Sequence, residues 1–136
     1  MLRVSMRVAG VAAALAVLWG SSAAGAATIG HGLRWHSPRK VSSGVPIAVA
    51  SKQSCPPVPT PGDTTLVGVS LNFTGGVLAT TLAPNPDGSW AGDVIFTFFV
   101  PLTGPTTLSA NCIDFNGHGG TVYADYTTRS VRIVPK

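Results

Sequence analysis

The side chains that could do chemistry in this chain of 136 residues are few: two cysteines, three histidines and five aspartates, with no glutamate. Nucleophilic catalysis needs a nucleophile beside a base, and carboxylate catalysis needs two carboxylates side by side. The sequence contains no G-x-S-x-G motif and no Cys/His arrangement. Ser109, His118 and Asp114 could meet only through the fold, because their spacing follows no catalytic motif. We therefore expect no enzyme activity.

The histidines and aspartates also lack the spacing of a metal site, and we expect no metal and no cofactor. The segment 114–117 resembles the start of a calcium loop, but His118 stands where a third oxygen ligand is needed, and no acid closes the loop. Asp and Asn beside glycines are typical of a turn. Because loops often carry recognition, Asp114, Asn116 and His118 form a candidate binding loop.

The first 27 residues have the three parts of a secretory signal peptide, which we expect to be helical. Arg3 and Arg7 precede an apolar run at 8–19, and small residues follow through Ala27. Cleavage there divides the chain into a signal peptide, 1–27, and a mature domain, 28–136, which has the size of one domain. An uncleaved anchor is the alternative, because residues 8–27 are uncharged and long enough to span a membrane. We expect an extracellular protein without a membrane span after cleavage.

Export would place the two cysteines, Cys55 and Cys112, in an oxidising compartment, where they allow one intramolecular disulfide. They lie 57 positions apart, and in the chain-entropy treatment a loop of that length makes the bond worth about 4 kcal/mol. Two free thiols are the alternative. We expect the bond to tie a loop to the end of a strand.

The charge of the mature domain is close to neutral. Removing the leader lowers the formal net charge from +4 to +2, because it takes away two arginines. So small a charge gives no basis for nucleic-acid binding. If the first and last strands are neighbours, basic residues from both ends of the mature domain would share one side: Arg34, Arg39, Lys40, Arg129, Arg132 and Lys136. That patch would contact an anionic cell wall or membrane surface, and ordinary solvated charge is the alternative.

The mature chain has the pattern of β structure almost throughout. Apolar and polar residues alternate in several segments, and turns rich in Pro and Gly separate them. The expected strands cover residues 45–49, 67–73, 77–82, 90–100, 108–112, 121–126 and 130–134, with a weaker one at 33–37. About seven short strands of this kind are typical of an antiparallel β-sandwich with Greek-key connections, and a small barrel is the alternative.

Aromatic residues lie on both faces of the expected strand 90–100. One face contributes to the core, for which we expect Trp90, Val94, Phe96, Val69 and Leu71. Ile95 and Phe99 lie on the other face, with Tyr123 beside them if the last strands join this sheet. An exposed apolar face of this kind would bind a partner. A covered face, or scattered apolar surface residues, is the alternative.

Several short motifs resemble those of bacterial secreted immunoglobulin-like modules. They are Ser37-Pro38, Cys55-Pro56, the turn and strand Pro86-Asp87-Gly88-Ser89-Trp90, then Pro101 and the segment 104–112 that ends at Cys112. The resemblance covers about residues 35–134 and implies an Ig-like sandwich. A more distant similarity is to the neocarzinostatin-type apoproteins, which carry two disulfides where this chain can form one.

These observations predict a secreted, non-catalytic Ig-like domain that acts in binding or as a structural module of the cell envelope. The similarity to neocarzinostatin-type apoproteins implies an alternative, a carrier of a small chromophore-like ligand. A hydrolase inhibitor is a third reading, which would need a protruding loop at 56–63 or 114–120. The expected partners are a cell-envelope polymer, a protein or a small apolar ligand.

Overall fold

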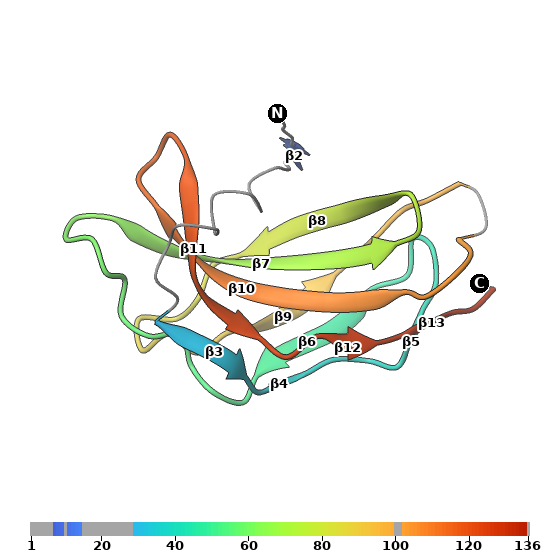
Figure 1. Ribbon diagram of the computed structural model, residues 1–136, viewed down its shortest axis with the longest axis horizontal. Helices are drawn as coiled ribbons and strands as arrows, with labels where there is room; N and C mark the ends of the chain where they lie inside the picture. The colour runs from blue at the N-terminus through green and yellow to red at the C-terminus, as the bar shows by residue number, and fades with distance from the viewer. Residues whose placement is uncertain (1–6, 10, 15–28, 100–101, 136) are drawn as a thin grey trace.

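The computed structural model describes residues 7–9, 11–14, 29–99 and 102–135 (Figure 1). All of its regular structure in these ranges is β, which confirms the all-β prediction. The strands are β1 Arg7–Ala9, β2 Val11–Ala14, β3 Gly30–Leu33, β4 Trp35–His36, β5 Lys40–Val41, β6 Ile47–Ser51, β7 Thr64–Phe73, β8 Gly76–Leu82, β9 Ala91–Val94, β10 Thr107–Phe115, β11 Gly120–Tyr126, β12 Arg129–Ser130 and β13 Arg132–Ile133. Within these ranges no helix is long and apolar enough to cross a membrane.

The strands form four sheets. The largest has the order β3-β11-β10-β7-β8, with β12 also paired to β10. A second sheet has the order β4-β6-β9, and two-stranded sheets are formed by β13 with β5 and by β1 with β2. Figure 1 shows the long strands β7, β10 and β8 in one layer and the short strands β6 and β9 in another. The core lies between these layers, because it draws its side chains from both.

The two longest strands, β7 and β10, supply one side of the core. In their antiparallel register Leu71 lies opposite Leu108, and Val69 lies opposite Ala110. All four side chains are buried. The apolar residues that alternate along β7 therefore face the core, as the sequence predicts. Burial of a Leu or Val side chain stabilises the fold by about 2 kcal/mol.

The second layer and its connections supply the aromatic part of the core. Trp90, Val94 and Phe96 are buried, as are the β7 residues Val69 and Leu71, so all five predicted core residues are confirmed. The ring of Trp90 also packs at a tilt against Trp35, 6.0 Å between centroids, and meets Tyr126 edge-on at 5.3 Å. Such edge contacts add to the free energy of burying the rings.

Three features of the fold differ from the prediction. The expected strand 90–100 is regular only at Ala91–Val94, because the backbone beyond it bonds to the turn at 42–45 instead of to a neighbouring strand. The expected antiparallel arrangement includes two parallel pairs, β11 with β3 and β13 with β5, which join the two ends of the mature chain. Residues 7–9 and 11–14 form strands where a helical leader was expected, and the rest of the leader lies outside the described residues.

Candidate functional site

The disulfide between Cys55 and Cys112 is present, with the two Cα atoms 5.9 Å apart, and confirms the predicted pairing. Cys112 lies in β10, whereas Cys55 lies in the loop between β6 and β7. The bond therefore starts in a loop, as expected, but it joins the interior of β10 and not the end of a strand, because Cys112 is paired with Val67 on one side and Ala124 on the other. Both cysteines are buried, so the bond belongs to the core and also fixes the start of the proline-rich segment 56–61.

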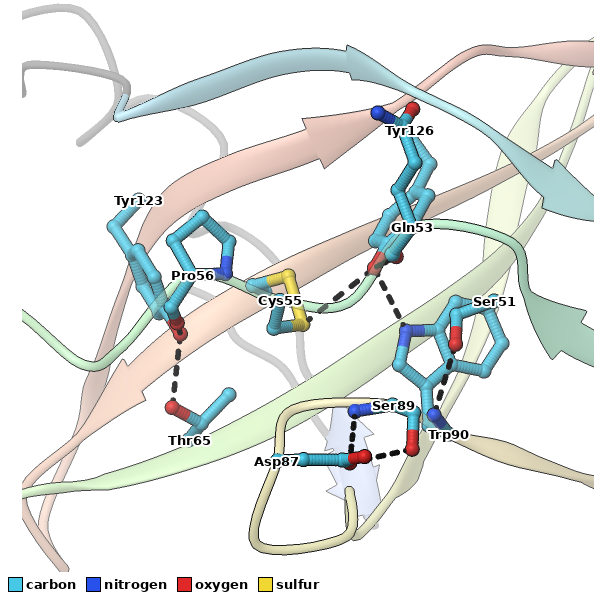
Figure 2. The surroundings of a disulfide bond; sticks show 11 residues. Ser51, Gln53, Cys55, Pro56, Thr65, Asp87, Ser89, Trp90, Tyr123 and Tyr126 are labelled. Atoms are coloured by element: carbon cyan, nitrogen blue, oxygen red, sulfur yellow. Dashed lines mark hydrogen bonds between the residues drawn. A yellow bond between two sulfur atoms is a disulfide. The ribbon is translucent and has the colours of Figure 1, made fainter.

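Tyr126 holds this loop against the core through its hydroxyl group (Figure 2). The hydroxyl donates to the Gln53 carbonyl at 2.6 Å and accepts from Trp90 Nε1 at 3.0 Å. Its oxygen lies 3.8 Å from Cys55 Sγ. Burial raises the pKa of Tyr126 above its ordinary value, although the Trp90 N–H works against that shift. The hydroxyl thus keeps its proton and remains a donor.

Tyr123 fixes the same loop three residues further along the chain, at Pro56. Its hydroxyl donates to the Pro56 carbonyl at 2.7 Å and pairs with Thr65 Oγ1 at 2.8 Å. The side chain is buried at 3% exposure. Tyr123 therefore does not lie with Ile95 and Phe99 on an outer face, and its expected place there is wrong. The strand β11 belongs to the large sheet, whereas residues 95–99 follow a strand of the other sheet.

The turn at 84–88 packs against the loop that contains Cys55. Cys55 N donates to the Gly88 carbonyl at 2.9 Å, which holds the turn against the disulfide loop. Gly88 has φ +86°, and a Cβ there would lie 2.3 Å from the Cys55 carbonyl oxygen. Only glycine fits both the backbone conformation and this close approach. Asp87 closes the turn by accepting from Ser89 N at 2.9 Å and from the Ser89 hydroxyl.

A groove of about 510 Å³ lies between the disulfide loop and this turn. Its size suits a small molecule or a side chain. Five apolar side chains and two carboxylates are among its lining residues: Cys55, Pro56, Pro57, Val58, Asp63, Thr64, Thr65, Pro84, Asn85, Pro86, Asp87 and Gly88. No basic side chain lines it among the described residues. The prolines make the walls stiff because their φ angles are fixed.

The carboxylates of the groove have pKa values displaced in opposite directions. A hydrogen bond with the Asp114 carboxyl raises the pKa of Asp63, and burial and the charge of Asp114 add to the shift. Hydrogen bonds from Ser89 lower the pKa of Asp87, which favours its charged form. Thr60 Oγ1 donates to Asp114 Oδ2 at 2.7 Å and so holds the partner of Asp63 in place.

The predicted binding loop is divided by the structure. Asp114 lies in β10 and accepts a hydrogen bond from Thr60. Asn116 and His118 lie in the β10–β11 turn, where Asn116 Oδ1 accepts from the backbone of His118 and Gly119. The amide of Asn116 is therefore used to close the turn. None of the three lines the groove, and only Asp114 interacts with a residue that does, Asp63. The role of this loop in binding stays a prediction.

The remaining predicted face consists of Ile95 and Phe99, which are 53% and 95% exposed. They lie beyond β9, close to the turn at 42–45 rather than to the groove. Sequence reasoning missed Asp63 and Asp87 as site residues because each lies in a segment interpreted as a connection. The prolines that precede each aspartate, at 59 and 61 and at 84 and 86, were the available signal. Among the described residues no group of three or more His, Cys, Asp or Glu could hold a metal ion.

No family model and no curated protein sequence matches the chain. Two solved structures are similar to it. A superoxide reductase (neelaredoxin) from Ignicoccus hospitalis is 12% identical, with 76% of this chain and 81% of that chain covered, at a TM-score of 0.41. A protein from Thermotoga maritima described as a superoxide reductase is 15% identical, with 76% and 86% covered, at a TM-score of 0.39.

These comparisons correct three expectations. The similar structures are superoxide reductases and not immunoglobulin-like or neocarzinostatin-type modules, so the expected family is wrong. The expected non-catalytic function and the carrier alternative are corrected with it, since neither similar structure is named as a binding module or a carrier. TM-scores of 0.41 and 0.39 transfer neither a site nor an activity to this chain. Its function has to be inferred from its own side chains.

Proposed function

We propose that this protein is exported and that the groove beside its disulfide holds a positively charged organic group of a ligand or substrate. The observation that carries the proposal is the lining of the groove. Asp63 and Asp87 face it, and no Lys or Arg is among its lining residues. A bound molecule that places an ammonium or amidinium group between the carboxylates would gain charge-assisted hydrogen bonds.

The apolar walls define the rest of the ligand. Pro56, Pro57 and Val58 lie on one side, and Pro84 and Pro86 on the other. A flat or short apolar body fits between them, since stiff walls cost little conformational entropy when a ligand binds. The ligand class is therefore a cation with a compact apolar part. The raised pKa of Asp63 sets the direction of the pH dependence. Binding of the cation should strengthen as pH rises, because Asp63 then loses its proton and becomes charged.

Export is supported by two independent features. The first 27 residues have the composition of a signal peptide. The fold contains a buried disulfide that closes a long loop, and such bonds persist in oxidising compartments. The N-terminal sequence of the protein recovered outside the cytosol tests this part. We expect it to start at residue 27 or 28, and an intact chain found only in the cytosol would contradict it.

Benzamidinium is a suitable probe for the groove, and benzamide is its neutral control of nearly the same shape. We expect benzamidinium to shift the NMR signals of residues 56–65 and 84–88 and to bind at least tenfold more tightly than benzamide. Equal affinity for the two compounds would contradict a charge-selective groove. So would shifts confined to other parts of the chain.

Two variants and one control test which carboxylates contribute to benzamidinium binding. Asp63→Asn and Asp87→Asn should each weaken benzamidinium binding by about threefold, as expected for a partly exposed ion pair. Asp93→Asn removes the same charge from β9, outside the groove, and should leave affinity unchanged. If Asp93→Asn weakens binding as much as the other two, the effect is general electrostatics and the groove is not the site.

A further inference from the structure

The end of the molecule away from the groove carries a pair of basic residues on two neighbouring strands. The strands β13 and β5 are parallel, with Arg132 opposite Lys40. Arg132 N donates to the Arg39 carbonyl at 2.8 Å, which brings a third cation to the same edge. All three side chains are exposed, and none has an ion-pair partner in the described part of the chain. Like charges held side by side repel, so an anionic partner would relieve a cost of the fold.

Exposed apolar side chains lie next to these cations. The turn at 42–45 follows β5 directly, and its Ser42 Oγ donates to the Val134 carbonyl just beyond β13 at 2.9 Å. Ser43 Oγ binds both the N–H and the carbonyl of Phe98, at 2.9 and 2.7 Å. Phe99 is therefore held beside this turn, and Figure 1 shows both segments near the C-terminal end of the molecule. Phe99 is 95% exposed, and Val45 in the turn is also exposed.

We infer that this end of the molecule, which we name the basic end and define as Arg39, Lys40, Arg132, Val45 and Phe99, contacts the surface of an anionic lipid bilayer. Cations beside protruding apolar side chains suit the headgroup region, where charges attract anionic lipids and an aromatic ring enters the acyl boundary. The inference uses none of the groove residues and goes beyond the proposed function.

A hollow beside Arg132 fits the same partner. It has a volume of about 380 Å³ and is lined by polar groups together with apolar ones, among them Ser130, Arg132, Leu102 and Ile133. A guanidinium binds phosphate oxygens in a bidentate manner. A phospholipid presents a phosphate next to apolar chains, which matches this mixed lining. A soluble polyanion would use the cations but would gain nothing from Phe99.

Vesicle flotation tests the inference, with the protein as recovered from expressing cells and vesicles of phosphatidylcholine alone or with 30% phosphatidylglycerol, roughly the charge at which a basic patch adheres. We expect binding only to the charged vesicles. Lys40→Gln with Arg132→Gln should reduce the partition coefficient at least about tenfold. Phe99→Ser should reduce it about threefold or more, because the inserted ring is lost.

Matched controls separate this surface from general attraction. Arg34→Gln with Lys52→Gln removes two exposed cations elsewhere, and Val77→Ser removes another exposed apolar side chain, so both should bind as the parent does. Thermal unfolding of every variant shows that it is folded. Equal loss with the control pair, an unchanged Phe99→Ser variant, or no binding to charged vesicles would each overturn the inference. Binding to soluble polyphosphate but not to vesicles would identify a polymer partner and overturn it too.

Discussion

The disulfide end and the basic end of this molecule are constructed in different ways. At the disulfide end one covalent bond, two tyrosine hydroxyls and a glycine turn fix the loop 53–58 from several directions. At the basic end the strands β5 and β13 are two residues long each, and Ser43 holds the neighbouring segment through one hydroxyl group. The first end forms a stiff acidic groove, and the second presents protruding cations and an exposed phenyl ring.

This difference relates local stability to the kind of partner each end suits. A groove selects a small cation only if its carboxylates stay in place, and the many fixed contacts of the disulfide end meet that need. A bilayer surface is soft and makes no demand for a fixed geometry. Segments with few buried contacts open at low free energy, so the basic end should exchange its amide hydrogens faster than the disulfide end.

Loss of the disulfide should produce the largest effect. Cys55→Ser with Cys112→Ser, or reduction of the parent protein, should lower the free energy of unfolding by about 4 kcal/mol, because the unfolded chain regains the freedom of a long loop. Urea unfolding with and without reductant measures it. The cysteine-free variant should not respond to reductant. If only the loop 53–65 becomes more mobile while the free energy of unfolding is unchanged, the bond orders this loop locally and does not stabilise the whole fold. The contrast in stability between the two ends would then be smaller.

Tyr126→Phe should have the next largest effect, a loss of about 2 kcal/mol, because it leaves the buried Trp90 Nε1 and the Gln53 carbonyl without their partner. Tyr123→Phe is the matched change, and it should cost about 1 kcal/mol, since neither of its partners, Pro56 and Thr65, is as buried as Trp90. Thermal and urea unfolding give both values. A Tyr126→Phe protein as stable as the parent would show that the hydroxyl network is not what fixes this end.

Much of the fold could be predicted from the sequence because its signals are local. The alternation in β7 and β10 placed Val69 and Leu71 in the core, and two cysteines allowed one bond. The strand 90–100 was predicted too long because Phe96 and Phe98 continue the alternation, while Ser43 and Gly44 take over their backbone bonds. Local hydrophobic periodicity cannot reveal a contact with residues about 55 positions away in the sequence.

The candidate site was harder to predict, since it depends on segments that meet only in the folded chain. Asp114 was singled out for its loop, but its partner Asp63 lies in a proline-rich connection 51 positions earlier. Tyr123 was placed on an outer face because sheet membership cannot be read from periodicity alone. The short motifs that suggested an immunoglobulin-like module consist of turn residues and a tryptophan, which many β proteins use for the same physical reasons.

Ser43→Ala tests the basic end at a single contact. Its hydroxyl binds the backbone of Phe98 on both sides, so removal should cost about 1 kcal/mol and should act locally. Hydrogen exchange should accelerate at the Phe98 amide and its neighbours, while amides of the disulfide end keep their protection. Ser42→Ala, which removes the bond to the Val134 carbonyl, is the companion variant at the same turn. Faster exchange spread evenly over both ends would remove the distinction between them.

The smallest expected effect concerns the two groove aspartates and depends on pH. The raised pKa of Asp63 means that the folded chain holds this proton more tightly, so the associated stability is present at low pH and is lost as pH rises from 3.8 through the raised value. The lowered pKa of Asp87 has the opposite result, a stability present above 3.8 and lost as pH falls through the lowered value.

At pH 7 Asp63→Asn should therefore raise the Tm slightly and Asp87→Asn should lower it. Both differences should shrink as pH falls through the raised pKa of Asp63 and then through the lowered pKa of Asp87 in the parent. Thermal unfolding at pH 7 and in a series of acidic buffers measures this, with Asp93→Asn as the control of equal charge. Shifts of the same sign at pH 7 would mean that the two carboxylates share one environment, and the pH dependence expected for cation binding would lose its basis.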